Sequence, residues 1–179
     1  MLAACDARPS FRSTDITGAP YGQAALELTD HNGKLRRLEE FRGKALVVFF
    51  GFTHCPDICP TTLADIAQAV RSLGADAERV QVVMVSVDPE RDTPESLGKY
   101  VTAFDPRFLA LRGDLAATKK VADEFKIYFE KAKTGESYTV NHSVQSYVID
   151  PQGRLRLLVR HDRIGQDLAE DLRAILKGA

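Results

Sequence analysis

The feature that most constrains the fold is a run of six apolar residues, 45–50, that leads into a pair of cysteines. The run is rich in β-branched and aromatic side chains, which is typical of a central strand buried on both faces. Apolar residues then recur at helical spacing over residues 63–70, and Pro60 suits the first turn of such a helix. Cys55 and Cys59 are therefore predicted to lie where a buried strand turns into a helix.

Strands and helices alternate through the rest of the chain. Further core strands are predicted at residues 80–87, 108–111, 143–149 and 154–159, the last two as an antiparallel hairpin around residues 150–153. Helices are predicted at residues 94–104, 114–125 and 166–176, with Asp114 capping the second. The order βαβαββα, with the cysteines after the first core strand, indicates an α/β, thioredoxin-like fold.

Two additions to this core are predicted. Residues 26–30 and 34–36 form an N-terminal β-hairpin extension, because the Asn-Gly pair between them favours the two positive-φ positions of a type I′ turn. Residues 129–140 are polar and contain Gly135, which predicts a small surface insertion before the last hairpin.

Residues 1–23 carry several turn-forming residues and no sustained apolar period, which predicts a tether to a domain of residues 24–179. The string Leu-Ala-Ala-Cys that ends at Cys5 resembles the end of a bacterial lipoprotein signal, where small residues precede a lipidated cysteine. No basic stretch or apolar segment precedes it. The match is either the remnant of a truncated signal, which we favour, or accidental, and the first interpretation predicts a lipid anchor at Cys5.

The charge and hydropathy of the chain exclude two broad classes of function. The formal net charge is −1, so no overall field favours nucleic acid or an anionic membrane surface. The longest apolar run is far shorter than the roughly 20 residues of a membrane-spanning helix. The sequence predicts a soluble domain that touches the membrane only through an N-terminal anchor.

The position and spacing of Cys55 and Cys59 indicate reactive or metal-binding thiols. The start of a helix lowers thiol pKa values, so thiolates would be populated near neutral pH. A spacing of four residues is slightly more than one helical turn and brings both sulfurs to one side with room for an ion. Soft sulfur ligands favour copper(I), and one added imidazole suits copper(II). A disulfide remains an alternative, whereas inert thiols do not fit a strand-to-helix turn, where α/β folds place ligands.

His142 is the candidate for the third group, because the topology can bring the start of the third core strand beside the cysteines. Thioredoxin-like redox enzymes carry a cis-proline at that point, and residues 139–143 contain no proline. The alternative is a solvated loop histidine. Of the others, His31 and His161 are predicted at the surface. His54, next to Cys55, is predicted to raise the thiolate content or to point outward rather than to bind an ion.

Asp88 ends the second core strand on the same edge of the sheet as the cysteines. This placement predicts a carboxylate near the metal. The alternative is that Asp88, which precedes a proline, only shapes the turn and caps the next helix.

Three strings together resemble the Sco/SenC (PrrC-like) family of copper-binding assembly proteins of cytochrome c oxidase. They are the Cys-Pro-x-x-Cys-Pro motif within residues 51–60, the string of residues 86–94, and His142 with Ser143. The similarity runs from about Leu26 to the C-terminus. It implies that Cys55, Cys59 and His142 bind one copper ion, Cu(I) or Cu(II), with Asp88 near the site.

The resemblance also implies a function. The chain would be a metallochaperone, rather than an enzyme, for the binuclear copper site of a respiratory oxidase. It would be a monomer tethered to the inner membrane in the bacterial periplasm, with the oxidase copper-site subunit, other copper chaperones and thiol reductants as partners. The alternative is a thiol-disulfide oxidoreductase that reduces the oxidase cysteines, or a redox sensor, with Cys55 and Cys59 as the redox pair. A peroxiredoxin-like peroxidase fits poorly, because Thr53 lies two rather than three residues before Cys55.

Overall fold

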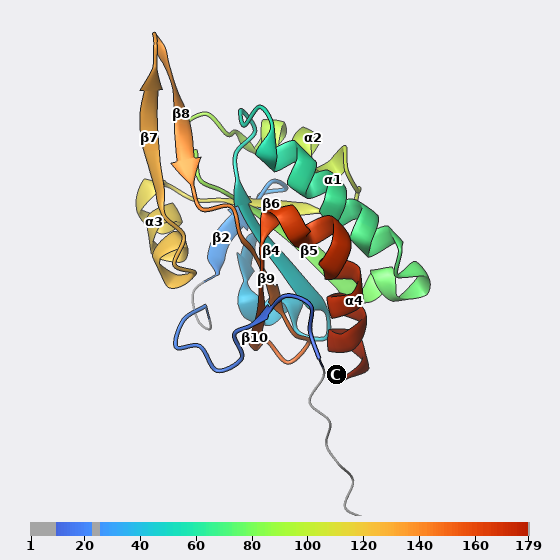
Figure 1. Ribbon diagram of the computed structural model, residues 1–179. Coiled ribbons are helices and arrows are strands. Elements are labelled where there is room, and N and C mark those ends of the chain that lie inside the picture. Colours follow the sequence, from blue (N-terminus) through green and yellow to red (C-terminus); the bar gives the residue numbers. More distant parts are fainter. Residues whose placement is uncertain (1–9, 23–25, 179) are drawn as a thin grey trace, which may run out of the picture.

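The structure is a computed structural model that describes residues 10–22 and 26–178 (Figure 1). Its described residues form a central sheet of strand order β1-β10-β9-β4-β5-β6-β2-β3 and a separate two-stranded sheet, β7-β8. The strands of the central sheet are β1 (Thr14–Asp15), β2 (Glu27–Asp30), β3 (Leu35–Arg37), β4 (Ala45–Gly51), β5 (Val80–Ser86), β6 (Leu109–Arg112), β9 (Ser146–Ile149) and β10 (Leu155–Val159). The other elements are β7 (Phe129–Thr134), β8 (Ser137–His142), α1 (Ile58–Arg71), α2 (Pro94–Thr102), α3 (Leu115–Glu124) and α4 (Ile164–Lys177). The predicted thioredoxin-like α/β fold is confirmed.

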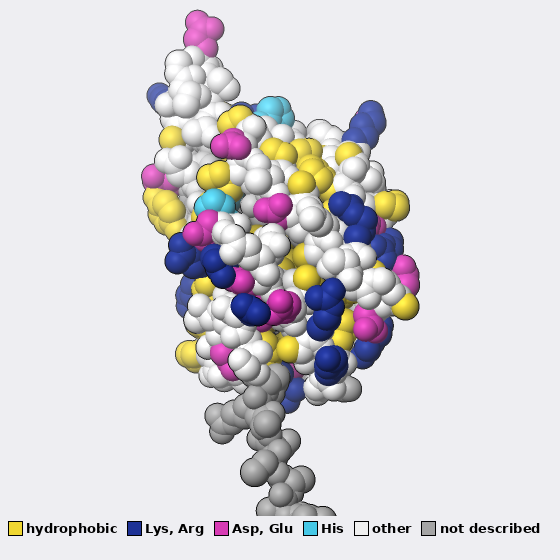
Figure 2. All heavy atoms as spheres, turned by 45° about the vertical axis from the view of Figure 1, so that its right-hand side comes forward, with side chains coloured by type: hydrophobic (Ala, Val, Ile, Leu, Met, Phe, Trp, Pro, Cys, Tyr) yellow, Lys and Arg dark blue, Asp and Glu magenta, His cyan; other side chains and the backbone are white. Residues whose placement is uncertain are grey.

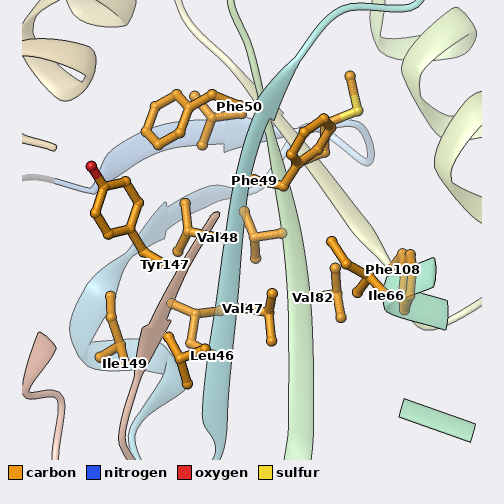
Figure 3. Close-up of a cluster of buried hydrophobic side chains, with 14 of the residues drawn as sticks. Leu46, Val47, Val48, Phe49, Phe50, Ile66, Val82, Phe108, Tyr147 and Ile149 are labelled. Carbon is orange, nitrogen blue, oxygen red and sulfur yellow. The ribbon is translucent and has the colours of Figure 1, made fainter. Parts of the chain in front are cut away.

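The core is built around β4, the predicted central strand. All seven of its residues are buried, and it pairs in parallel with β5 and antiparallel with β9. Successive side chains alternate between the two faces of the sheet. Phe50 and Tyr147 lie on one side of β4 and Phe49 lies on the other (Figure 3). The ring of Phe125, just after α3, packs against Phe50 and Tyr147, while α1 and α4 pack against each other. Helices therefore cover the sheet on both sides, and β4 is enclosed by them and by its neighbours β5 and β9.

Residues 10–22, the described part of the predicted tether, lie against the domain. β1 pairs with β10, and the amides of Arg12 and Ser13 donate to the carboxylate of Asp171 on α4. The amide of Gly22 donates to the carbonyl of Glu124 at the end of α3. The segment thus adds an edge strand to the sheet. Cys5 and its predicted lipid anchor fall outside the described residues.

The predicted N-terminal hairpin is confirmed as β2 and β3, but its turn is not type I′. Of the two turn residues, only Gly33 has a positive φ, of 84°. The carboxylate of the buried Asp30 instead accepts hydrogen bonds from the amides of Asn32 and Lys34 at 2.9 and 3.0 Å, and it pairs with Arg36. An aspartate that caps the turn amides therefore selects a different turn from the one that Asn-Gly favours.

The last hairpin repeats this arrangement at Asp150, between β9 and β10. Its carboxylate accepts hydrogen bonds from the amides of Gln152 and Arg154 and pairs with the side chains of Arg154 and Arg156. The β9–β10 hairpin itself was predicted correctly. Both hairpins of the central sheet are thus closed around a buried aspartate.

The largest difference from the prediction lies before β9. The third core strand was expected from residue 143, but β9 begins at Ser146, and residues 129–142 form the antiparallel β7–β8 hairpin. This hairpin projects from the body of the molecule (Figure 1). His142 therefore ends β8 and does not start the core strand, because pairing with β7 takes the residues before it out of the central sheet.

The surface is consistent with the small net charge. On the face shown in Figure 2, basic and acidic side chains are interspersed. No helix among the described residues is long and apolar enough to cross a membrane.

Candidate metal centre

The two cysteines lie in the turn that joins β4 to α1. Cys59 is in the first turn of α1 and is fully buried, whereas Cys55 is partly exposed in the turn before it. The amide of Cys59 donates to Cys55 Sγ at 3.3 Å. Neither cysteine is in a disulfide. The predicted placement at the strand-to-helix turn is therefore confirmed, and it leaves one accessible and one enclosed sulfur.

The two sulfurs differ in their affinity for a proton. A hydrogen bond from the Cys59 thiol lowers the pKa of Cys55 to about 4, against the effect of burial and with further help from the amides of Cys59 and Asp57. The pKa of Cys59 is raised, because its thiol hydrogen bonds to Cys55 and because it is buried. The pair therefore shares one proton, with the thiolate on Cys55 and the thiol on Cys59.

His142 reaches the cysteines from the end of β8. Its Nε2 atom lies 3.7 Å from Cys59 Sγ, although the two residues are 83 positions apart. Its Nδ1 atom lies 2.8 Å from the carbonyl oxygen of Ser143. A carbonyl only accepts hydrogen bonds, so we place the ring hydrogen on Nδ1, which leaves the lone pair of Nε2 directed toward the cysteines. The ring also packs edge-on against Phe52, with centroids 5.8 Å apart. The sequence-based prediction that His142 lies beside the cysteines is confirmed.

These three side chains fit a soft metal ion by chemistry, and Cys59 and His142 also do so by distance. Two sulfurs and one imidazole nitrogen form a donor set that suits copper. Metal–sulfur and metal–nitrogen bonds of about 2.3 and 2.0 Å, set at about 120°, would place the two donor atoms about 3.7 Å apart. Among the described residues, no group of three or more His, Cys, Asp or Glu side chains lies close enough together to hold a metal ion. The geometry therefore shows one close donor pair, Cys59 and His142, with Cys55 beside it.

A small hollow opens beside these donors. Its volume is about 220 Å³, and Cys55 and His142 lie in its wall. The other lining residues are mostly apolar: Phe52, Pro56, Ile58, Thr139, Val140, Asn141 and Val144. The accessible sulfur is thus reached through an uncharged surface formed by the cysteine turn on one side and the hairpin on the other.

Asp88, the carboxylate predicted near the metal, is fully buried and is engaged by two other residues. Arg91 pairs with it, and the hydroxyl of Tyr138 donates to its Oδ1 atom at 2.9 Å. Its carbonyl accepts the amides of Arg91 and Asp92, so it does shape the turn after β5. It does not cap α2, because Thr93 is the N-terminal cap of that helix.

Asp92 is a site-supporting residue to which the sequence analysis assigned no role. It is buried, and its carboxylate accepts hydrogen bonds from the hydroxyls of Thr53 and Ser86, both at 2.6 Å, and from the Thr53 amide at 3.2 Å. Asp92 therefore ties the cysteine turn to the loop after β5. Its only sequence signal was membership of the string at residues 86–94.

The remaining histidines do not join the donor set. His54 is exposed, and its Nδ1 atom lies 3.1 Å from the hydroxyl of Thr53. His161 lies in a short 3-10 helix before α4. The prediction that His31 is a solvated surface residue is wrong, because its Nδ1 atom accepts the amide of Ala110 at 3.2 Å and so fastens the first hairpin to β6.

Known proteins resemble this chain over nearly its whole length. The model of the family described as SCO1/SenC matches residues 14–177. The mitochondrial SCO2 homolog of Bos taurus is 35% identical over 170 residues, which is 93% of this chain and 64% of that protein. The chain thus spans about two thirds, or slightly less, of the length of the relatives that it matches.

Solved structures agree with the fold. ScoI of Bradyrhizobium japonicum, solved with copper bound, has a TM-score of 0.76 and 39% identity, covering 83% of this chain and 96% of that one. The apo Sco1 protein of Thermus thermophilus has a TM-score of 0.82 and 37% identity, covering 94% and 98%. A third structure, of BsSco, is described as showing a disulfide switch in a member of the Sco family of cytochrome c oxidase assembly proteins. Its TM-score is 0.68 and its identity 25%, covering 93% and 95%.

Proposed function

This chain belongs to the SCO1/SenC family, and from that premise we propose that it is a copper-binding metallochaperone for the assembly of a respiratory cytochrome oxidase. The observation that carries the proposal is the approach of His142 Nε2 to within 3.7 Å of Cys59 Sγ. It supplies the nitrogen that separates a copper donor set from a simple dithiol. Copper-bound structures of related Sco proteins support the same choice of metal.

We propose Cys55, Cys59 and His142 as the ligands of one copper ion per chain. Cys55 is already a thiolate, because its pKa is lowered to about 4, and His142 directs its Nε2 atom toward the cysteines. Cys59 must lose its proton to act as a ligand, since its pKa is raised by Cys55 and by burial. The two sulfurs suit copper(I), and the imidazole allows copper(II) as well.

The ion is cargo in this proposal. Its destination is the binuclear copper site of the oxidase, and the copper-site subunit is the partner that receives it. The proposed location is the bacterial periplasm, with attachment to the inner membrane through the lipidated Cys5. The partly exposed Cys55 and the uncharged hollow beside it offer a surface at which such an exchange can occur.

Copper titration of the reduced protein tests the ligand set. Wild type is expected to bind one copper per chain and, with copper(II), to show thiolate-to-copper charge-transfer absorption. His142→Ala removes the only nitrogen donor of the set and is expected to lose tight binding. His161→Ala is the matched control, because it removes a histidine outside the site. Unchanged affinity and spectrum in His142→Ala would contradict the proposal.

The alternative, a thiol-disulfide oxidoreductase, is favoured by one observation. A partly exposed thiolate beside a buried thiol is the arrangement of an attacking and a resolving cysteine. Copper-free protein can be offered an oxidised peptide that carries the two cysteines of an oxidase copper site. Reduction at an unchanged rate in His142→Ala, together with an oxidase defect that added copper does not relieve in a deletion strain, would favour this alternative over copper delivery.

A further inference from the structure

The β7–β8 hairpin carries His142 but lies outside the central sheet. An isolated two-stranded hairpin is at best marginally stable in water. None of the six residues of β7 is buried, and in β8 only Val140 is. The position of His142 therefore depends on the contacts that fasten the hairpin to the body.

The densest of these contacts is made by Tyr138. It lies four residues before His142, so both side chains are on the same face of β8. Its hydroxyl donates to Asp88 Oδ1 at 2.9 Å, and its carbonyl accepts a hydrogen bond from Arg91 Nη1, also at 2.9 Å. The Arg91 guanidinium lies 3.8 Å from the centre of the Tyr138 ring. One residue of the hairpin is thus held through its hydroxyl, its ring and its backbone.

The residues of the body that hold Tyr138 are themselves fixed in place. Asp88 is fully buried in the turn after β5, and its second carboxylate oxygen pairs with Arg91 Nε. The guanidinium of Arg91 also lies 5.9 Å from the centre of the Phe52 ring. Phe52 in turn packs edge-on against the ring of His142. The same arginine therefore contacts the hairpin and the aromatic ring against which the imidazole lies.

We propose that Asp88, Arg91 and Tyr138 form a latch that holds the β7–β8 hairpin against the body and thereby positions His142 beside Cys59. The three are positioning residues, because their hydrogen bonds reach one another and not the donor atoms. The effect of the latch on copper rests on the proposed function, whereas its effect on the hairpin does not.

Amide hydrogen exchange in copper-free protein tests the latch by itself. Tyr138→Phe removes only the hydroxyl that bonds to Asp88, and Arg91→Lys keeps the charge but loses the planar fork that bonds and stacks on Tyr138. Both are expected to speed exchange in peptides covering residues 129–142 several-fold, with no change in peptides from β4. Tyr128→Phe is the control, because the hydroxyl of this exposed tyrosine bonds to Glu130 within the hairpin and not to the body. Exchange as slow in both variants as in Tyr128→Phe would overturn the latch.

Copper affinity tests whether the latch acts through His142. Residues that directly orient a metal ligand typically change affinity by 10- to 100-fold, and the latch acts one contact further away. Tyr138→Phe is therefore expected to weaken copper(II) binding about tenfold in wild type, but less than about twofold in a His142→Ala background. An equal loss in both backgrounds, or no loss in wild type, would overturn the positioning role. If wild type bound no copper, the proposed function would fail, and the exchange experiment would still decide whether the latch exists.

Discussion

The two walls of the candidate metal centre are built in opposite ways. The cysteine wall, residues 51–59, begins at the last residue of β4, whose seven residues are all buried. Cys59, at its other end, is itself part of the core. The hairpin wall, residues 129–142, stands outside the central sheet and is held by a few polar and ring contacts. One wall is therefore fixed by close packing, while the other buries only Val140 in the core.

The largest expected effect is at Asp92, which fastens the cysteine wall to the loop after β5. Asp92→Ala leaves the buried hydroxyl of Ser86 and the partly buried hydroxyl of Thr53 without this acceptor, so the free energy of unfolding is expected to fall by about 3 kcal/mol. Urea unfolding measures this loss. The exposed Asp57→Ala, in the same turn, is the control and is expected to change stability by less than about 0.5 kcal/mol. Equal effects of the two substitutions would show that the cysteine wall is less rigid than we infer.

The next largest loss of stability is expected from a substitution at Gly51, at the end of β4. A methyl group there would lie 2.7 Å from the ring of Phe49 and 3.1 Å from Cys59 Sγ. Gly51→Ala is therefore expected to cost about 2 kcal/mol of unfolding free energy, because a close-packed interior cannot absorb the added carbon. Urea unfolding again provides the measurement. A loss below about 0.5 kcal/mol would mean that the wall yields to overpacking.

Within the cysteine wall, the two sulfurs should be separable by their reactivity. Because the pKa of Cys55 is lowered to about 4, its alkylation rate is expected to stay flat from pH 8 down to about pH 5. Cys59→Ala removes the largest cause of that lowering. The pKa of Cys55 then rises, its thiolate fraction at pH 6 falls, and alkylation at that pH is expected to slow about tenfold or more. Mass spectrometry of iodoacetamide adducts measures both rates.

Urea-unfolded protein is the reference for this experiment. Its cysteines have ordinary pKa values, so their alkylation should fall about tenfold for each pH unit below about 8.5. A folded protein that showed the same profile would contradict the assignment of the thiolate to Cys55.

The smallest effect is expected at the tip of the hairpin wall. Gly135 has a φ of 62°, and a Cβ atom there would meet nothing within 4 Å. Gly135→Ala should therefore cost only the backbone strain of the left-handed region, about 1 kcal/mol. The loss should appear as faster amide exchange within residues 129–142, with global urea unfolding unchanged. Gly135→Asn, which tolerates this region, should show less of it. A drop in global stability as large as that of Gly51→Ala would erase the distinction between the walls.

The sequence predicted the cysteine wall better than the hairpin wall, for a physical reason. The strands β4 and β5 were predicted to within one residue at each end, because continuous apolar runs must be buried wherever they lie. The first residues of the third core strand were misplaced, because residues 143–145 carry no such pattern. The hairpin itself was predicted only as a polar surface insertion, since its strands lack a buried face and pair with each other rather than with the core.

The contacts of the candidate site also differ in how far the sequence predicts them. The meeting of the cysteines with His142 was predicted correctly but from a wrong premise, because His142 ends β8 and does not start the third core strand, which begins four residues later at Ser146. The latch could not be predicted. The bonds of Tyr138 to Asp88 and Arg91 join residues 50 and 47 positions apart, and they depend on the register of the hairpin. The role of Asp92 could not be predicted either, because its partner Thr53 lies 39 residues away in the sequence.

The central sheet has a further property that follows from its two ends. Its outermost strands are short, since β1 has two residues and β3 has three, whereas β4 and β5 inside the sheet have seven each. An edge strand exposes unpaired amide and carbonyl groups to which another chain can add by hydrogen bonding. Short edges, with Arg36 and Arg37 on one of them, offer little backbone for such pairing. The central sheet is therefore poorly suited to joining that of a second molecule edge to edge, which protects it against aggregation by strand addition.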